Sequence, residues 1–359
     1  MSELNVAIVG SGLIATKKHI PAFRRLGSEA TLTTICDVDP DSAQGAANRF
    51  DISSAYTDLG ELLSQEKPDL VDICTPPKTH SDLAIQAIEG GAHVLIEKPM
   101  AMDVEECNEI VEAAEQNGRK VCVAHSDLFY PPFLQAQERI ENGDIGEFKG
   151  MRIFLSTPTD YMTSQEDHWA HELPGGVIGE SGPHVVYLTL PFINPVQEVR
   201  AYGLKNMSYP WSKYEDYRVD LVGEDTASTI TCIYTTDQWD AQVDIWGTEG
   251  MLKLDLELMT LTDHGRPSLD SWQLAGSGLS QSLQTIGDTI QTGAQVLLGR
   301  YQKTHDLLIE QFVDSIHRDT GSPVPAEEGR EAVRVMNLIV KKLGEENTSE
   351  TKKEKVDKK

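Results

Sequence analysis

The stretch that decides the fold is LNVAIVGSGLIA, residues 4–15. It opens as an apolar run and closes in the pattern G-x-G-x-x-A, formed by Gly10, Gly12 and Ala15. A strand that leads through this turn into a helix is typical of a dinucleotide-binding βαβ unit. The first glycine permits the tight turn, the second lets a pyrophosphate approach the backbone, and the alanine lets the helix pack closely on the sheet. The stretch therefore predicts a Rossmann domain with phosphates at the N-terminus of its first helix.

The residues after this stretch continue the pattern. Short apolar runs predict strands, and stretches with helical periodicity predict helices between them. The expected strands are 5–9, 30–36, 70–74, 93–96 and 120–124, and the expected helices are 13–26, 41–50, 81–90 and 104–117. Alternation at such short intervals predicts a doubly wound parallel sheet covered on both faces. We expect residues 1–122 to form this domain.

Asp37 indicates which dinucleotide is bound. It ends the second expected strand, where a carboxylate can accept hydrogen bonds from both hydroxyls of the adenosine ribose. The same charge repels a 2′-phosphate, and the next residues, Val38 and Asp39, offer no positive charge. The alternative is that Asp37 is an ordinary turn residue. The sequence predicts NAD in preference to NADP.

The pattern changes after the first third of the chain. Strand-like runs now follow one another, at 149–155, 198–204, 227–234, 242–247 and 251–256, with one helical stretch at 179–192. This order predicts an α+β domain with a large, mostly antiparallel open sheet. Later helices are expected around 279–298, 304–317 and 327–343. We expect residues 123–344 to form a substrate-binding and oligomerisation domain, followed by a disordered charged tail at 345–359.

The helix expected around 279–298 is amphipathic. Leu279, Leu283, Ile286 and Ile290 recur at helical spacing and form one apolar stripe. The stripe either covers the sheet or meets another subunit, and cover is the preferred interpretation.

Composition excludes several classes of protein. The 359 residues carry a formal charge of −26, so nucleic acid, whose phosphates need a basic face, is not expected as a partner. No apolar run approaches the roughly 20 residues that span a bilayer, and the start of the chain lacks the features of a secretory signal. We therefore expect a cytoplasmic protein with no membrane partner. Its acidity indicates either adaptation to high salt or, as we prefer, a solvated acidic surface.

The five cysteines, Cys36, Cys74, Cys107, Cys122 and Cys232, are odd in number and are not at metal-ligand spacing. We interpret them as reduced core thiols, as expected in a reducing compartment.

Five later segments carry a family resemblance. They are TPPKTH at 75–80, GAHVLIEKP at 91–99, GGVIGESGPH at 175–184, and the pair GTEG at 247–250 and PVPAEEGR at 323–330. Together they resemble the Gfo/Idh/MocA oxidoreductases over about residues 4–340. The resemblance implies hydride transfer between NAD and a secondary alcohol or ketone of a sugar, cyclitol or nucleotide sugar, with the substrate between two domains. It also implies a homodimer or homotetramer formed through the C-terminal sheet.

The resemblance and the fingerprint together indicate the site residues. The expected cofactor-binding residues are Gly10, Gly12, Leu13, Ile14, Asp37, Thr75, Pro76, His80, Glu97 and Lys98. The expected catalytic residues are Lys98 and His184. A neutral histidine suits the abstraction of a hydroxyl proton, because its pKa lies near the working pH. An ammonium beside the reacting oxygen stabilises a developing alkoxide. The alternatives to these catalytic roles are structural: His184 is a core histidine with its hydrogen bonds satisfied, and Lys98 is an exposed lysine that follows a strand.

The chain departs from the common family pattern at three positions. Glu180 and Tyr187 stand where aspartates are usual on either side of His184, and Leu128 replaces an arginine. Substrate-binding residues are expected at His125, Trp169, Glu180 and Tyr187. Trp169 lies between His168 and His171, but their spacing is too loose for a metal site and none is predicted. These departures leave open a non-catalytic NAD-binding regulator, or a redox-neutral enzyme with tightly bound NAD, such as a glycosidase or epimerase.

Overall fold

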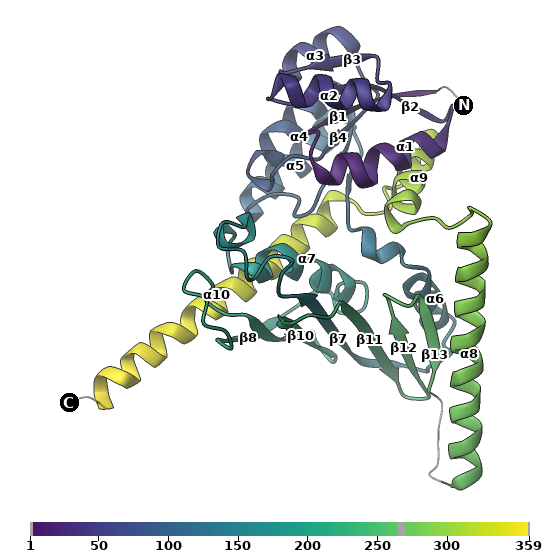
Figure 1. Ribbon diagram of the computed structural model, residues 1–359, viewed down its shortest axis with the longest axis vertical. Helices are drawn as coiled ribbons and strands as arrows, with labels where there is room; N and C mark the ends of the chain where they lie inside the picture. Colours follow the sequence, from purple (N-terminus) through teal and green to yellow (C-terminus); the bar gives the residue numbers. More distant parts are fainter. Residues whose placement is uncertain (1–2, 265–269, 358–359) are drawn as a thin grey trace. The chain divides into compact units, whose positions relative to one another are not determined.

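The computed structural model describes residues 3–264 and 270–357, and the chain forms two compact units (Figure 1). The N-terminal unit comprises Met1–Phe129 and Gln302–Arg334, and the C-terminal unit comprises Tyr130–Tyr301 and Val335–Lys359. The sequence pattern had placed the first boundary at residue 122 and assigned 302–334 to the second domain. The structure groups that later segment with the first, so each unit is built from two stretches of chain.

The N-terminal unit contains a six-stranded parallel sheet in the order β3-β2-β1-β4-β5-β6. Its strands are β1 (Leu4–Val9), β2 (Ala30–Cys36), β3 (Ser54–Tyr56), β4 (Leu70–Ile73), β5 (His93–Ile96) and β6 (Val121–Val123). Its helices include α1 (Ile20–Leu26), α2 (Pro40–Phe50), α3 (Leu59–Glu66), α4 (His80–Glu89) and α5 (Val104–Asn117). This arrangement confirms the predicted Rossmann domain. The strand order reverses between β1 and β4, and ligands of such sheets bind at the carboxyl ends of the strands there.

Residues 302–334 complete this unit. Their helix α9 (Thr304–His317) carries Asp306, which is buried and forms an ion pair with Arg25 of α1. The ammonium of Lys120 donates to the carbonyls of Ser315 at 3.1 Å and Thr320 at 2.7 Å. These contacts compensate the buried Asp306 carboxylate and join residues 302–334 to the Rossmann unit.

The C-terminal unit is built on a seven-stranded sheet in the order β13-β12-β11-β7-β10-β9-β8. Its strands are β7 (Phe148–Pro158), β8 (Glu198–Leu204), β9 (Asp216–Val222), β10 (Ala227–Thr236), β11 (Asp240–Gly247), β12 (Met251–Asp255) and β13 (Thr260–Asp263). Neighbouring strands are antiparallel except for β7 and β10, which run parallel. The sheet confirms the predicted mostly antiparallel α+β architecture.

Three helices accompany this sheet. α6 (Pro131–Glu141) precedes it, and α7 (Val177–Thr189) packs on β7 and β10. α8 (Ser271–Leu297) lies along the edge strand β13 (Figure 1). The preferred expectation, that the apolar stripe of α8 covers the sheet, was wrong. Leu283 is 59% exposed and Ile290 is 66% exposed, because the helix turns a polar face to β13 instead.

Helix α10 runs from Ala326 to Asp357, through most of the segment expected to be a disordered tail. The last two residues of that expectation, 358–359, lie outside the described residues. Glutamate and lysine, which are frequent in this segment, have high helix propensity. A long α10 is therefore compatible with a composition that has little to bury.

All five cysteines are buried, and none forms a disulfide. Burial raises the pKa of Cys36 to about 11 and that of the other four to about 12. The thiols are therefore protonated and act as small apolar side chains. Among the described residues, no helix combines the length and apolarity needed to cross a membrane.

His93, the first residue of β5, gives the fold a pH dependence. Its Nδ1 accepts a hydrogen bond from the backbone N–H of Lys120 at 2.9 Å, which requires an unprotonated nitrogen. Burial, together with the positive charges of Arg119 and Lys120, lowers the pKa of His93 to about 4. The unfolded chain takes up this proton near pH 6.5, so stability is full above that pH and falls as the pH drops towards 4.

Replacing His93 by glutamine is expected to remove this part of the acid sensitivity. The full pKa shift of His93 corresponds to about 3 kcal/mol in the free energy of unfolding. Because the ring is partly exposed, we expect about 1–2 kcal/mol. Urea unfolding at pH 7 and pH 5 measures the difference. His317→Gln, at a histidine that bonds the surface carbonyl of Glu29, serves as the control. Equal pH dependence of wild type and H93Q would contradict the expectation.

Candidate functional site

The glycine turn at the end of β1 leaves room for a phosphate group. Gly10 has φ +96°, and a Cβ there would lie 2.7 Å from the carbonyl oxygen of Cys74, so only glycine fits. A Cβ on Gly12, by contrast, would meet no atom within 4 Å. Ala15 is fully buried, whereas Leu13 is 76% exposed. The turn therefore has a tight side that packs on the end of β4 and an open side where a pyrophosphate fits.

The chain after this turn includes a π-helical stretch, Ala15–His19, which leads into α1. π-Helical turns within helices often occur at functional sites. Here the stretch carries His19 inward, where the side chain is completely buried.

Asp37 lies beside the glycine turn. Its Oδ2 accepts hydrogen bonds from the backbone N–H of Ser11 at 2.8 Å and from the Ser11 hydroxyl at 2.6 Å. Its Oδ1 accepts from the backbone N–H of Asp39 at 3.1 Å. These bonds hold the carboxylate at the end of β2, next to the phosphate turn, as the predicted ribose contact requires. The residues present therefore fit a dinucleotide whose adenosine ribose lies at Asp37.

Thr75 and Pro76 follow β4 at the same edge of the sheet. The Thr75 hydroxyl accepts a hydrogen bond from that of Thr79 at 2.8 Å. The His80 ring is buried between two carbonyl oxygens, that of Thr75 at 2.8 Å and that of Pro99 at 2.9 Å. Burial lowers the pKa of His80, so a neutral ring donates one of these bonds at a time. His80 thus connects the turn after β4 to the turn after β5.

The turn after β5 carries Glu97, Lys98 and Pro99. The peptide bond between Lys98 and Pro99 is cis. Glu97 is buried, and its Oε2 accepts a hydrogen bond from the backbone N–H of Lys98 at 3.0 Å. The Glu97 side chain therefore fixes the peptide from which the Lys98 side chain projects.

A buried ion-pair network, which no sequence pattern indicated, fixes Glu97 in turn. His19 bonds Asp72 of β4 through Nδ1 at 2.8 Å and Glu97 through Nε2 at 2.9 Å. His305 of α9 lies 3.8 Å from the same Glu97 oxygen. We call Asp72, His19 and Glu97 the buried triad. In the sequence its members are far apart and stand as isolated residues.

The charges of the triad follow from its geometry. Burial by itself lowers the pKa of His19. The negative charge of Asp72 and its hydrogen bond with His19 have the larger effect, so the pKa is held well above its ordinary value. Burial likewise raises the pKa of Glu97, but the hydrogen bond from His19 and the nearby His305 ring hold it well below its ordinary value. His19 is therefore an imidazolium between two carboxyl groups.

Two sets of side chains could hold a metal ion by distance alone, within the part of the chain that the structure describes. They are His19 with Asp72 and Cys74, and His19 with Glu97 and His305, with all ligand atoms within 4.8 Å. Both sets depend on His19. Because each of its nitrogens carries a proton bonded to a carboxylate, His19 offers no lone pair to a metal. We assign these residues to the ion-pair network.

Helix α7 of the C-terminal unit presents His184. Ten of the residues in Val177–Thr189 are buried, and the half-buried exceptions are Gly179, Glu180 and His184. Glu180 and His184 are one turn apart and therefore lie on the same side of the helix. Tyr187, three residues further on, is buried, and its hydroxyl lies 2.7 Å from His184 Nδ1. This bond orients the imidazole ring.

Glycines and a proline shape α7 around this histidine. Pro183 lies inside the helix and not in its first turn, where a proline is best tolerated. A Cβ on Gly179 would lie 2.6 Å from the carbonyl oxygen of Pro174, and one on Gly182 would lie 2.8 Å from Met336. The backbone contact at Gly179 leaves no room for a side chain, so the glycine pattern serves packing as well as the delivery of His184.

Other expected residues lie at scattered positions. His125 and Leu128, both buried, follow β6 in the N-terminal unit. Trp169 is 52% exposed at the start of a short 3-10 helix, Trp169–Glu172. His168 accepts a bond from the backbone N–H of Ala170, and His171 bonds the carbonyls of Met162 and Gln165. These two histidines therefore brace their own loop.

The C-terminal unit also contains a cavity of about 250 Å³ near the start of α7. Its lining is aromatic and polar: His171, Leu173, Gly175, Gly176, Trp211, Ser212, Lys213, Tyr214, Tyr217, Val340 and Leu343. The volume is slightly below the roughly 300–1,000 Å³ of common small-molecule sites. Neither Glu180 nor His184 belongs to the lining.

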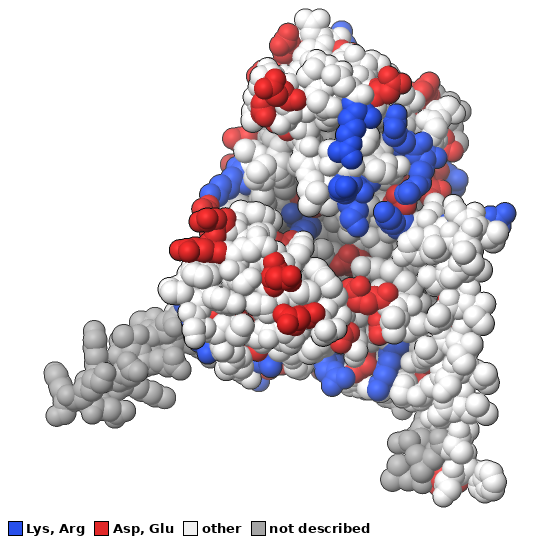
Figure 2. Space-filling view, viewed as in Figure 1, with Lys and Arg blue, Asp and Glu red and all other residues white. Residues whose placement is uncertain are grey.

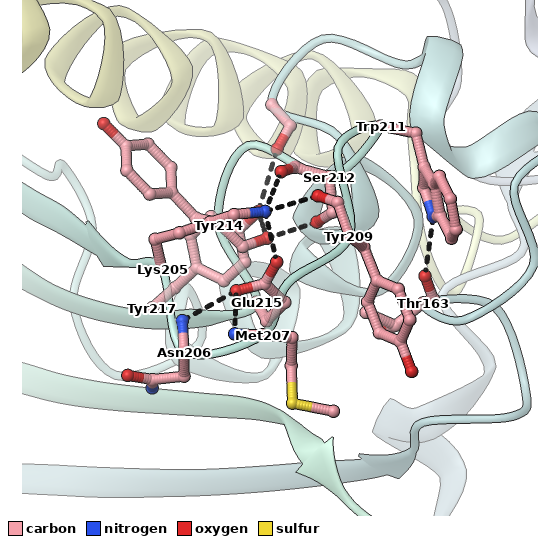
Figure 3. Close-up of polar contacts among 11 residues, drawn as sticks. Thr163, Lys205, Asn206, Met207, Tyr209, Trp211, Ser212, Tyr214, Glu215 and Tyr217 are labelled. Carbon is pink, nitrogen blue, oxygen red and sulfur yellow. Dashed lines mark hydrogen bonds and ion pairs between the residues drawn. The ribbon is translucent and has the colours of Figure 1, made fainter.

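An ion pair between an exposed lysine and a buried glutamate shapes the loop beside this cavity (Figure 3). Lys205 lies 2.8 Å from Glu215, which is fully buried and also accepts bonds from the backbone N–H groups of Asn206 and Met207. The Trp211 indole donates to the carbonyl of Thr163 at 3.1 Å. This loop was not among the expected site residues, although tyrosine and tryptophan clustered between two strands were a readable signal.

The structure thus assembles the expected site residues in two groups. One group, at the carboxyl edge of the six-stranded sheet, contains Gly10, Gly12, Asp37, Thr75, His80, Glu97 and Lys98. The other, on α7, contains Glu180, His184 and Tyr187. The first group can bind a dinucleotide and place an ammonium near its end, and the second can exchange a proton.

Comparison with known families agrees with this division. Residues 4–125 match the profile of the oxidoreductase family with an NAD-binding Rossmann fold. Residues 133–253 match the profile of the GFO/IDH/MocA C-terminal domain. NAD, which Asp37 predicted, is therefore confirmed as the cofactor class of the N-terminal domain.

Individual relatives align over part of their length. The chain is 32% identical over 179 residues to D-glucoside 3-dehydrogenase of Escherichia coli, which is 49% of each protein. It is 29% identical to oxidoreductase P35 of Formosa agariphila, over 55% of this chain and 63% of that protein. It is 27% identical to inositol 2-dehydrogenase of Salmonella typhimurium, over 45% of this chain and 49% of that protein. The chain therefore spans about half to two thirds of the curated relatives that it matches.

Solved structures match over nearly the whole chain. The WlbA dehydrogenase of Bordetella pertussis, in complex with NADH and UDP-GlcNAcA, has a TM-score of 0.78 at 20% identity and covers 96% of both chains. An oxidoreductase of Agrobacterium radiobacter, in complex with NAD⁺, L-tartaric acid and magnesium, has a TM-score of 0.78 at 19% identity, over 95% of this chain and 96% of that one. At such identities the likeness shows the fold. Together with the two domain profiles, it places this chain in the GFO/IDH/MocA oxidoreductase family.

Proposed function

We propose that this protein transfers a hydride between NAD and a secondary alcohol or ketone of a sugar, cyclitol or nucleotide sugar. The observation that carries the proposal is the edge of the six-stranded sheet. There the open glycine turn after β1, the Thr75 turn after β4 and the Glu97-Lys98-Pro99 turn after β5 follow neighbouring strands. Relatives named D-glucoside 3-dehydrogenase and inositol 2-dehydrogenase support a carbohydrate-like substrate.

Lys98 has the role of an electrostatic catalyst in this proposal. Bound NAD supplies the acceptor for the hydride. The alcohol must lose a proton as the hydride leaves, and the resulting negative charge on oxygen needs a nearby donor. The Lys98 ammonium provides it, and Glu97 fixes the backbone from which the side chain extends.

His184 has the role of general base. A histidine accepts a hydroxyl proton at neutral pH if one nitrogen is unprotonated and properly directed. The bond between Tyr187 and His184 Nδ1 sets this direction. When Nδ1 donates to the tyrosine oxygen, Nε2 is the basic nitrogen. Glu180, one turn earlier on the same side of α7, has the role of a substrate contact.

Turnover tests the proposal directly. NAD and NADP are each combined with a panel of sugars, inositols and nucleotide sugars, and the absorbance of the reduced nicotinamide is followed. We expect turnover with NAD, and a loss of about 100- to 10,000-fold in kcat/KM for His184→Ala. His317→Gln, a histidine on the last turn of α9, is the control. Tight NAD binding without turnover on any substrate would favour a regulator or a redox-neutral enzyme instead.

The cofactor preference is tested at Asp37. In the variant Asp37→Asn, the amide keeps the shape of the side chain and an acceptor for the Ser11 bonds but removes the charge. A hydrogen bond to a charged group contributes about 1.5–3 kcal/mol, so we expect NAD affinity to fall about 10- to 100-fold. Affinity for NADP should rise or stay level, because the repulsion of the 2′-phosphate is gone. Isothermal titration with both dinucleotides measures this, with Asp41→Asn on α2 as control. An unchanged NAD to NADP ratio would rule out the ribose contact.

A further inference from the structure

Helix α8 turns its polar face, and not its apolar face, towards its own sheet. Three polar contacts join it to the edge strand β13 and the residue after it. Asp288 accepts from the backbone N–H of Leu261 at 2.9 Å, Gln284 accepts from that of Asp263 at 2.8 Å, and Gln281 lies 3.0 Å from the His264 ring. The helix thus covers the unpaired N–H groups of an edge strand, a common protection of sheet edges.

The apolar residues of α8 point the other way. We define the α8 stripe as Leu279, Leu283, Ile286, Ile290 and Leu297, which are 63%, 59%, 55%, 66% and 88% exposed. At about 100° per residue, the stripe lies about 180° around the helix from the polar contacts. A helix of a lone soluble protein normally buries its apolar face and exposes its polar one. The reversal indicates that another surface covers the stripe.

The spacing of the stripe indicates what kind of surface that is. Its residues are separated by four, three, four and seven positions, which is the heptad spacing of apolar residues in coiled coils. A straight seam of leucine and isoleucine at this spacing fits a second seam of the same kind. The stripe is therefore complementary to itself.

The charge of α8 argues against a membrane surface and permits a second copy. Within Ser271–Leu297 the one charged residue is Asp288, whose carboxylate already bonds β13. The surface of this helix is accordingly almost free of blue and red in Figure 2. Amphipathic helices that lie on membranes carry lysine and arginine on their polar face, and this one has none. Two copies of a chain with charge −26 repel each other, and α8 offers a contact without that repulsion.

The area is sufficient for a stable contact. Trp272, seven residues before Leu279 and 87% exposed, lies in line with the stripe. Val296 and Leu298, 57% and 66% exposed, flank its C-terminal end and bring the large apolar side chains to eight. At roughly 100 Å² each, the area implied by about 2.5 kcal/mol per side chain and 25 cal/mol per Å², they amount to about 800 Å². That is the share of one partner in a standard specific interface.

We propose that the α8 stripe is the docking surface for a second copy of this chain, α8 against α8. The contact is isologous, since the same residues meet from both copies. The family resemblance implied association through the C-terminal sheet, and the α8 contact is a different surface of the same unit. The proposal does not depend on the catalytic role of any residue.

The mass of the full chain in solution tests the proposal. Sedimentation velocity is measured for wild type, for Leu283→Glu combined with Ile286→Glu, and for a control pair, Ser280→Glu with Gln291→Glu. The control adds the same charge to exposed positions of the same helix, away from the stripe. We expect the stripe variant to have half the mass of wild type and the control to keep the wild-type mass. Circular dichroism verifies that both remain folded.

A cysteine test gives a second readout. All five native cysteines are buried, so Leu283→Cys and Ile286→Cys introduce accessible thiols on the stripe, and Gln291→Cys introduces one off it. We expect mild oxidation to join two copies covalently through at least one stripe position and not through Gln291→Cys. A monomeric wild type, an unchanged mass of the stripe variant, or binding of the monomer to lipid vesicles would overturn the proposal.

Discussion

Lys98→Met is expected to lower kcat about 100- to 1,000-fold and to lower NAD affinity much less. Methionine keeps most of the length of the side chain but removes the ammonium, and the loss of one donor to a developing oxyanion has an effect of this size. The peptide at Lys98 remains fixed, because Glu97 accepts its backbone N–H. Stopped-flow or steady-state kinetics with the best substrate, and titration with NAD, separate the two effects.

The matched control is Lys149→Met, at a lysine that is 43% exposed and pairs with Glu147 at the start of β7. It removes the same charge from the sheet of the other unit. A drop of tenfold or less at Lys98, or an equal loss of NAD affinity and kcat, would mean that Lys98 binds the cofactor and does not act on the reacting oxygen.

The second large effect concerns stability. His19→Ala is expected to destabilise the N-terminal unit by about 3–5 kcal/mol, because removal of one partner leaves buried charge without compensation. Asp72 and Glu97 would then face each other across a cavity, each having lost a bond of 2.8 or 2.9 Å. Chemical unfolding followed by circular dichroism measures the loss. The surface control His317→Gln should change stability by less than about 1 kcal/mol.

The triad also predicts a pH window. The raised pKa of His19 gives a contribution that is complete below about pH 6.5 and lost as the pH rises through the folded-state pKa. The lowered pKa of Glu97 gives one that is complete above about pH 4.3 and lost as the pH falls through the folded-state pKa. Together they favour weakly acidic to neutral conditions. If H19A keeps the pH profile of wild type, the triad is not the source of this dependence.

Much of the N-terminal fold was readable from the sequence. The strand His93–Ile96 and the helix Val104–Asn117 have the predicted bounds, since an apolar run and a period of 3.6 residues are strong local signals. The glycine turn and Asp37 were also predicted, because a phosphate turn needs particular residues at fixed spacing.

Strand β9 was not predicted, although its charged residues alternate with buried Tyr217, Val219 and Leu221, a period of two that is a readable signal. Other features depend on contacts that local patterns do not encode. The triad joins residues 53 and 78 positions apart, which no local pattern can relate. For α8, periodicity indicated the apolar stripe but not its direction, because the side that faces the sheet is decided by the unpaired N–H groups of β13.

The discontinuity of the two units has a consequence for synthesis. Residues 302–334 close the Rossmann unit, and Val335 and its successors close the other. When the first 129 residues have left the ribosomal exit tunnel, the strands of the sheet are present, but Arg25 and Lys120 still lack their partners in residues 302–334. Neither unit can be completed until almost the entire chain has emerged. Nascent chains should bind chaperones until late in translation, and truncation before α9 should yield protein that is degraded and not a separate NAD-binding domain.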